Sequence, residues 1–172
     1  MTDDINSDAE FAYGAGHINP ARAVNPGLVY DAGETDYVEF LCGQGYDTKS
    51  LRLVTGDKSS CSNVHKKHAS ELNYPSFVVS TSSKKHVTKL FRRTVTNVGS
   101  PDSTYKATVK APKGLKINVK PRTLSFESVG QRKSFVVKVR AQVDEMRSMI
   151  SGSLVWSDGH RQVRSPVVAY YS

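Results

Sequence analysis

From residue 76 onward, apolar and polar residues alternate with a period of two, and this pattern constrains the fold most. In residues 104–110, Tyr105, Ala107 and Val109 alternate with threonines and lysines, and residues 115–120 repeat the pattern. Because successive side chains of a β-strand point to opposite faces, the alternation predicts strands with one buried face. A turn at residues 111–114, Ala-Pro-Lys-Gly, is expected to join these two strands.

Further strands are expected toward the end of the chain. Phe135, Val137 and Val139 repeat the inward pattern, as do Leu154 and Trp156. An Asp-Gly pair at 158–159 is typical of a hairpin turn, here leading back along residues 162–168. About seven short strands in roughly 100 residues, with frequent turns, predict an antiparallel β-sandwich.

Residues 1–71 carry turn and helix-cap patterns instead. Asn19-Pro20 is typical of an N-cap followed by proline at the first helical position. A second short helix is expected over residues 36–42, with Thr35 as its cap, and a weaker one over residues 48–54. Such short helices are marginal alone, so we expect roughly the first 30 residues to be loosely held unless they pack on the sandwich or on another chain. The apolar face expected for the 36–42 helix consists of Tyr37, Phe40 and Leu41.

Length and charge set further limits. The 172 residues, 38% of them hydrophobic, suffice for one core. We expect no membrane span, because no apolar run approaches about 20 residues, and Met1–Asp4 is too polar for a signal peptide. Residues 1–71 hold 6 Lys and Arg against 11 Asp and Glu, whereas residues 72–172 hold 18 against 5. This shift from −5 to +13 predicts a boundary near residue 71 and suggests an anionic partner for the second part.

Residues 10–31, EFAYGAGHINPARAVNPGLVYD, closely resemble the stretch that plant subtilisin-like serine proteases carry shortly after their catalytic serine. Five further blocks follow in the family's order, at residues 36–42 (DYVEFLC), 71–77 (ELNYPSF), 93–99 (RTVTNVG), 154–159 (LVWSDG) and 164–166 (RSP). Residues 40–46, FLCGQGY, are similar to the cucumisin-type group of these proteases.

The resemblance implies a mainly β chain in two domains. Residues 1–71 would be the C-terminal remnant of a subtilisin-like α/β catalytic domain with its connecting segment, and residues 72–172 a fibronectin type III-like sandwich. The implied role is accessory: the sandwich packs on the protease domain, its partner, and supports it. The implied location is the apoplast or cell wall.

No catalytic residue is assigned, because the family's aspartate, histidine, oxyanion asparagine and Gly-Thr-Ser serine segments have no counterpart in this sequence. The chain alone is therefore expected not to be an enzyme, although the family consists of serine endopeptidases. His17 and Ser76 are interpreted as structural, since neither lies in a nucleophile motif. Gly14-Ala15-Gly16 lacks the third glycine of a nucleotide-binding loop, and no cofactor is predicted.

Cys42 and Cys61 are the chain's only cysteines. The secreted habit of the family favours a disulfide between them, and two free thiols are the alternative. A zinc site formed by these cysteines with His65 and His68 is a weaker hypothesis, because the spacing is irregular and the neighbouring Lys66 and Lys67 add positive charge. We therefore predict no metal site. No Asn-X-Ser/Thr acceptor occurs for N-glycosylation.

The basic residues of the second part have two interpretations. Four lysines fall on outward strand positions, where charge keeps a sandwich soluble, and two local doublets accompany them: Lys106, Lys110, Lys116, Lys120, Lys84-Lys85 and Arg92-Arg93. The alternative is an independent basic module that binds the protease, its propeptide or a cell-wall polyanion. No nucleic-acid partner is predicted, because the basic residues are not interleaved with aromatics and no helix-turn-helix or zinc-finger pattern occurs. The oligomeric state stays open.

Overall fold

The computed structural model describes residues 8–62, 64–65, 67–82, 86–143 and 149–172. They form two compact units. One comprises the chain up to Tyr30 together with Pro75–Ser172, and the other comprises Asp31–Tyr74. These units do not coincide with the expected division at residue 71, because the chain up to Tyr30 packs with the sandwich. The origin of residues 1–71 in a catalytic domain stays a prediction.

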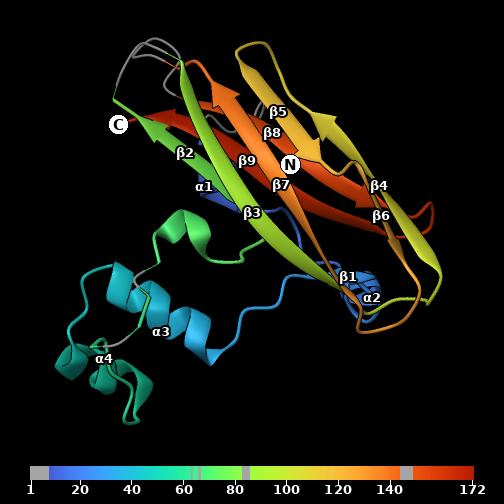
Figure 1. Ribbon diagram of the computed structural model, residues 1–172. Helices are drawn as coiled ribbons and strands as arrows, with labels where there is room; N and C mark the ends of the chain where they lie inside the picture. Colours follow the sequence, from blue (N-terminus) through green and yellow to red (C-terminus); the bar gives the residue numbers. More distant parts are fainter. Residues whose placement is uncertain (1–7, 63, 66, 83–85, 144–148) are drawn as a thin grey trace. The chain divides into compact units, whose positions relative to one another are not determined.

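The larger unit is a sandwich of two β-sheets (Figure 1). The first sheet has the order β1-β3-β7-β5, with bounds Leu28–Val29, Val87–Asn97, Arg132–Ala141 and Leu115–Lys120. The second has the order β2-β9-β8-β4-β6, with bounds Phe77–Thr81, Gln162–Tyr171, Met149–Ser157, Ser103–Lys110 and Thr123–Phe126. The predicted β-sandwich is confirmed.

Two details of the pairing differ from the sequence-based expectation. Strands β4 and β5, which the turn at residues 111–114 joins, lie in different sheets, since β4 pairs with β8 and β5 pairs with β7. The turn thus crosses between the sheets, and both strands direct their apolar faces into one core. Strand β2 runs parallel to β9, whereas the other strand pairs are antiparallel.

The sandwich core contains aromatic pairs among its aliphatic side chains. Trp156 and Phe135 face each other from opposite sheets with ring centroids 5.1 Å apart in an edge-on arrangement. Phe77 and Phe91 make a similar contact at 5.3 Å. Trp156, Leu154, Val137 and Val139 are fully buried and Phe135 nearly so, as the alternating pattern predicted.

The smaller unit, Asp31–Tyr74, contains α3 (Glu34–Gly43), α4 (Thr48–Thr55) and a 3₁₀ turn at Ala69–Glu71. Its buried core consists of Val38, Cys42 and Leu51, and the structure joins Cys42 to Cys61 in a disulfide. None of the described helices combines the length and apolar content that crossing a bilayer requires.

The predicted cap of α3 is wrong, and its predicted apolar face is only partly confirmed, because Leu41 packs against the buried cluster whereas Tyr37 does not. Gly33, not Thr35, is the N-cap, and the Asp36 carboxylate accepts a hydrogen bond from the Gly33 N–H at 2.9 Å. Val38 and Cys42 are buried, whereas Tyr37 is 45% exposed. The helix begins two residues earlier than its cap pattern indicated, and the disulfide draws the Cys42 side inward.

Gly43 leaves room for the backbone of the segment that closes this unit. A Cβ at Gly43 would lie 1.8 Å from the Lys67 carbonyl oxygen. The ammonium of Lys67 in turn binds Asp36 and Glu39, each at 2.7 Å, and these bonds raise the pKa of Lys67.

Substituting Gly43→Ala is therefore expected to destabilise the smaller unit by about 1–3 kcal/mol, because backbone cannot move aside as a flexible side chain can. Gly33→Ala is the matched control, since its Cβ would meet only the Asp36 carboxylate at 3.9 Å. Amide exchange of residues 31–74 checks the prediction. Equal exchange in the two variants contradicts it.

Candidate functional site

Residues 8–30, here called the N-terminal segment, contain α1 (Glu10–Tyr13), α2 (Pro20–Ala23) and β1. The Asn19 side chain accepts a hydrogen bond from the Arg22 N–H at 3.2 Å, which confirms the predicted cap. The segment contacts the sandwich at three places. These contacts are the candidate functional site, because they join the stretch that resembles a protease to the sandwich.

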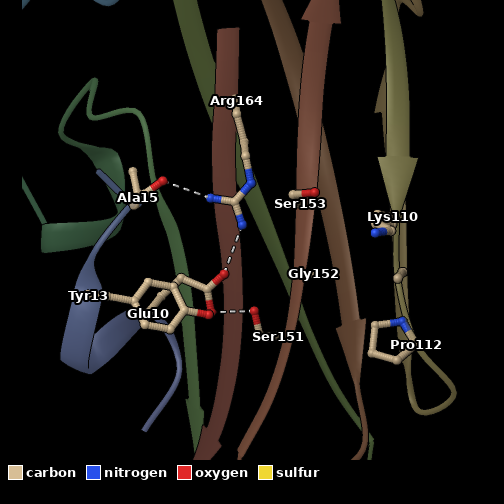
Figure 2. Close-up of a pocket in the computed structure, with 11 residues that line it drawn as sticks. Glu10, Tyr13, Ala15, Lys110, Pro112, Ser151, Gly152, Ser153 and Arg164 are labelled. Atoms are coloured by element: carbon tan, nitrogen blue, oxygen red, sulfur yellow. Dashed lines mark hydrogen bonds and ion pairs between the residues drawn. The ribbon is translucent and has the colours of Figure 1, made fainter. Parts of the chain in front are cut away.

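The first contact centres on Glu10 (Figure 2). Its carboxylate accepts a hydrogen bond from the Arg164 guanidinium at 3.0 Å and another from the Ser151 hydroxyl. A second nitrogen of Arg164 donates to the Ala15 carbonyl at 3.2 Å. The Glu10 side chain is only 6% exposed, whereas that of Arg164 is 41% exposed, so the ion pair is partly buried. The contact borders a cavity of about 560 Å³ whose far wall includes Lys110 and Pro112.

The second contact seats Gly27 against the turn that follows β3. The Gly27 carbonyl accepts from the N–H groups of Val98 and Gly99 at 2.9 and 3.1 Å. Gly27 has φ +83°, and a Cβ there would lie 2.4 Å from the Tyr105 hydroxyl. The turn is held by buried Asn97, whose amide nitrogen donates to the carbonyls of Ser100 and Ser128 at 2.9 and 3.2 Å.

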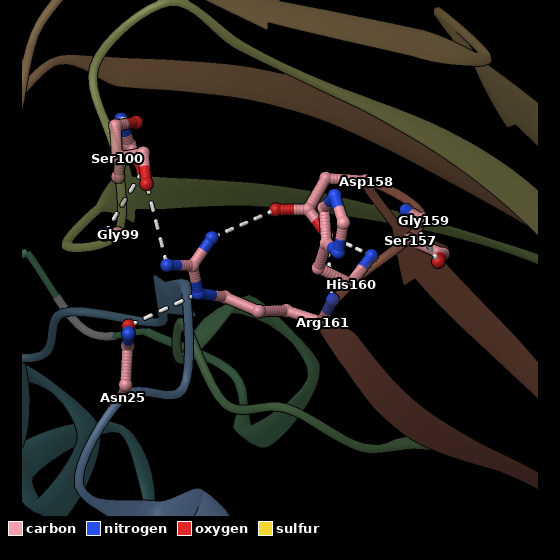
Figure 3. A network of polar contacts seen from close by, with 9 residues as sticks. Asn25, Gly99, Ser100, Ser157, Asp158, Gly159, His160 and Arg161 are labelled. Carbon is pink, nitrogen blue, oxygen red and sulfur yellow. Dashed lines mark hydrogen bonds and ion pairs between the residues drawn. The ribbon is translucent and has the colours of Figure 1, made fainter.

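Arg161, in the loop between β8 and β9, ties this contact together (Figure 3). Its guanidinium donates to the Asn25 side chain at 3.1 Å, the Ser100 hydroxyl at 3.3 Å and the Asp158 carboxylate at 3.1 Å. Three of the sequence blocks that carry the family resemblance, at residues 10–31, 93–99 and 154–159, therefore meet at one place.

Asp158 orders the loop that presents Arg161. Partial burial opposes its ionisation, but hydrogen bonds from the backbone N–H groups of Arg161 and His160, at 2.6 and 2.9 Å, outweigh burial and hold its pKa below the ordinary 3.8. A group whose folded-state pKa is lowered stabilises the fold above its unfolded pKa and loses this effect as the pH falls through the folded value.

Asp158→Asn is thus expected to lower the melting temperature at neutral pH, and the difference from the unsubstituted chain should shrink below pH 3.8. Thermal unfolding followed by circular dichroism between about pH 6 and pH 2 measures it. A difference that stays constant over this range contradicts the assignment.

The third contact is made by β1 and Tyr30. Leu28 is buried and pairs with Asn97 of β3. The Tyr30 hydroxyl shares a hydrogen bond of 2.9 Å with Ser165, and its ring meets Phe135 edge-on at 6.3 Å. Burial raises the pKa of Tyr30.

Arg93 lies beside Tyr30 and faces the core. Its guanidinium lies 5.1 Å from the ring centre of Phe77 and 5.4 Å from that of Phe91, and it donates to the Ser76 carbonyl at 3.5 Å. Burial lowers the pKa of Arg93 to about 10, so it stays charged at neutral pH. Treating Arg92-Arg93 as one surface doublet was wrong, because Arg92 is exposed and Arg93 is 3% exposed.

His17 is exposed in the N-terminal segment and Ser76 is partly buried just before β2. Within the described residues, neither side chain is hydrogen-bonded or ion-paired, so no nucleophile–base pair is formed by them. Gly14 and Gly16 both have positive φ and lie in the loop after α1, next to the Ala15 carbonyl that Arg164 binds.

The cysteines and the remaining basic residues are also placed. With Cys42 and Cys61 joined, neither supplies the thiolate that the zinc hypothesis needs. The described part of the chain contains no group of three or more His, Cys, Asp or Glu side chains that could hold a metal ion. Lys106, Lys110, Lys116 and Lys120 are exposed, whereas Lys66 and Lys84-Lys85 lie outside the described residues.

Sequence reasoning did not identify Glu10, Asn25, Arg161 and Arg164 as a site. Each lies in or next to a block that resembles the family, which is the only feature that could have pointed to them. Their pairing joins positions more than 130 residues apart, and local patterns carry no information on it.

Comparison with known proteins gives a family match and close relatives. Residues 71–169 match the family model described as fibronectin type-III domain. The chain is 48% identical over 170 residues to Subtilisin-like protease SBT4.6 of Arabidopsis thaliana, with 98% of this chain and 23% of that protein covered. It is also 48% identical over 169 residues to Subtilisin-like protease SBT4.14 of the same plant, with 96% and 23% covered.

The chain therefore spans about a quarter of the length of these relatives. Among solved structures, a FixG-related protein from Vibrio parahaemolyticus has a TM-score of 0.36 at 12% identity, covering 51% of this chain and 96% of that one. This likeness is too weak to support an inference about function.

Proposed function

Since the chain belongs to the fibronectin type III domain family and corresponds to the C-terminal part of plant subtilisin-like proteases, we propose that it is the accessory part of such a protease. In this role the sandwich holds the end of the catalytic domain in place and contributes no group to peptide-bond cleavage. Its partner is the protease domain. We also propose an extracellular location, in keeping with the Cys42–Cys61 disulfide, because disulfides persist in oxidising compartments.

One observation carries the proposal: the N-terminal segment is held on the sandwich by a partly buried ion pair, by hydrogen bonds from the turn after β3 to the Gly27 carbonyl, and by a strand pairing. In the family this stretch follows the catalytic serine. A sandwich that binds this stretch fixes the path of the chain where the chain leaves the catalytic domain. Such binding supports activity by keeping the catalytic domain folded and its catalytic groups in position, because small displacements of catalytic groups reduce rates strongly.

The isolated chain is expected to lack hydrolytic activity. Incubation with a fluorescent phosphonate that modifies activated serines should give no stoichiometric labelling, and casein should stay intact. An active subtilisin serves as the positive control. Stoichiometric labelling of Ser76 or of any other serine contradicts the proposal.

The accessory role is tested in a chimera in which this chain replaces the matching part of SBT4.6. We expect the chimera to be processed and active. Removing the two guanidinium groups that grip the N-terminal segment, with Arg161→Met and Arg164→Met, should lower the yield of active protease by about tenfold. The matched control, Lys106→Met/Arg122→Met, removes the same charge from exposed positions and should leave the yield unchanged.

Full activity of the double variant contradicts the proposal, provided that amide exchange confirms release of the segment. If the control variant loses activity as well, the effect is due to net charge. This outcome also contradicts the proposal.

A further inference from the structure

The outer face of the β3-β7-β5 sheet concentrates positive charge. Along these strands, residues alternate between buried and exposed, and the exposed positions of the outer face include six cationic residues. They are Arg92, Lys116, Lys120, Arg132, Lys138 and Arg140, here called the basic face.

The charges of the basic face are not neutralised within the described chain. Strands β3, β5 and β7 contain no Asp or Glu. Among the described residues, none of the six cations takes part in an ion pair. In the other sheet, Arg164 of β9 is paired with Glu10 of the N-terminal segment, whereas the exposed Lys106 and Lys110 of β4 also take part in no ion pair with a described residue.

The pairing register places like charges directly against each other. Lys116 of β5 is opposite Arg140 of β7, and Lys138 lies two residues along the same strand face. Arg92 and Lys120 flank Val136 from its two sides. Like charges opposite each other on neighbouring strands are destabilising. An anion bound across them would offset this repulsion. The arrangement therefore favours the anion-bound state over the free protein.

The shape of the face narrows the choice of ligand. Cations recur about 6.6 Å apart along a strand and about 4.8 Å apart between strands. The face has no aromatic side chain on which bases could stack. Its apolar residues are limited to Leu90 and Val136, which do not form the buried anchor cluster of a protein interface.

We propose that the basic face binds a linear acidic polysaccharide, whose anionic groups contact successive cations across the three strands. The inference goes beyond the accessory role proposed above and does not depend on it. A chain of sugars bearing one carboxylate at regular intervals needs neither a groove nor an apolar pocket. It needs repeated charge on an open face, which β3, β7 and β5 provide.

The probe is polygalacturonate, a linear carboxylated polymer, immobilised beside neutral dextran, with the full 172-residue chain in solution. We expect binding to polygalacturonate alone, falling steeply between about 50 and 200 mM salt. The variant Lys116→Gln/Lys138→Gln/Arg140→Gln should bind about tenfold more weakly. The matched control is Lys106→Gln/Lys110→Gln/Arg122→Gln, which removes the same charge from exposed positions away from the basic face and should change affinity less than about twofold.

Equal losses in the two triple variants show attraction to net charge alone and overturn the proposal, as does absence of binding at low salt. Tighter binding to duplex DNA than to polygalacturonate, at equal anion concentration, overturns the choice of ligand. Because all six substitutions are at exposed positions, both variants should fold, and circular dichroism checks this.

A second measurement separates binding from stability. Without polymer at low salt, the basic-face variant is expected to melt at a higher temperature than the unsubstituted chain, because the repulsion between Lys116 and Arg140 is gone. Polymer should raise the melting temperature of the unsubstituted chain and leave that of the variant nearly unchanged. The same rise in both overturns the proposal.

Discussion

Reduction of the Cys42–Cys61 disulfide is expected to unfold residues 31–74 while the sandwich stays folded. Among the described residues, the buried cluster of the smaller unit consists of Val38, Cys42 and Leu51, and one of these three residues is itself part of the disulfide. A core of this size rarely suffices alone, and small units depend on such crosslinks. The bond closes a loop of 19 positions, which stabilises the folded unit by about 3 kcal/mol in the chain-entropy model.

Amide exchange followed by mass spectrometry distinguishes the two units before and after reduction. Peptides within residues 31–74 should lose protection, whereas peptides of β7 and β8 should keep theirs. Cys42→Ser/Cys61→Ser should reproduce the effect without reductant. Unchanged protection of α3 and α4 after complete reduction, verified by thiol alkylation, contradicts the account.

Arg93→Ala is expected to destabilise the sandwich by on the order of 3 kcal/mol. The guanidinium contacts Phe77 and Phe91 and donates to the carbonyls of Arg92 and Ser76. It also lies beside Tyr30. Arg93 is therefore close to the chain just before and just after residues 31–74, which form the smaller unit. Its removal deletes packing inside the core and leaves two carbonyls at partly buried positions without this donor.

Arg93→Met separates these two effects, because methionine fills much of the same volume without donating hydrogen bonds. We expect Arg93→Met to recover most of the melting temperature, while the amides around Tyr30 and Ser76 exchange faster than in the unsubstituted chain. Denaturant unfolding and amide exchange measure the two quantities. If methionine restores both the melting temperature and the amide protection in full, the guanidinium does not hold Tyr30 and Ser76 in place, and the prediction is contradicted.

The strands could be predicted from the sequence because burial imposes a period of two. Trp156 and Val137 are buried as their positions in the alternation required. Arg93 fits the same pattern, since it lies two residues from both Phe91 and Val95 and is buried on the same strand face, yet its charge suggested a surface position. Here the period of the strand was the better guide, and two aromatic rings supply the environment that a buried guanidinium needs.

Long-range pairing could not be predicted in the same way. The turn at residues 111–114 has the composition of a hairpin, but β4 and β5 join different sheets because each finds its partner elsewhere in the chain. The parallel alignment of β2 with β9 is likewise set by the whole sandwich. The contacts of Glu10 and Arg161 depend on this assembly, so the candidate site could be recognised only after the strands were in place.

The helices of the smaller unit show the limit of cap patterns. Asp47 caps α4 through the Ser50 N–H at 2.7 Å, and Gly56 ends the helix in a left-handed conformation, close to the expected bounds. At α3, Thr35 was the expected cap, but the Asp36 carboxylate accepts a hydrogen bond from the Gly33 N–H, which makes Gly33 the cap. Two neighbouring caps differ too little in energy for the sequence alone to decide.

The most direct test is amide exchange of residues 25–30 in the monomeric 172-residue chain, because the account requires the sandwich itself to hold this part of the N-terminal segment. We predict exchange at least about 100-fold slower than in a free peptide, and a loss of this protection in Arg161→Met. Exchange at the rate of a free peptide, with β3 and β9 still protected, would show that the segment is not seated and would contradict the account.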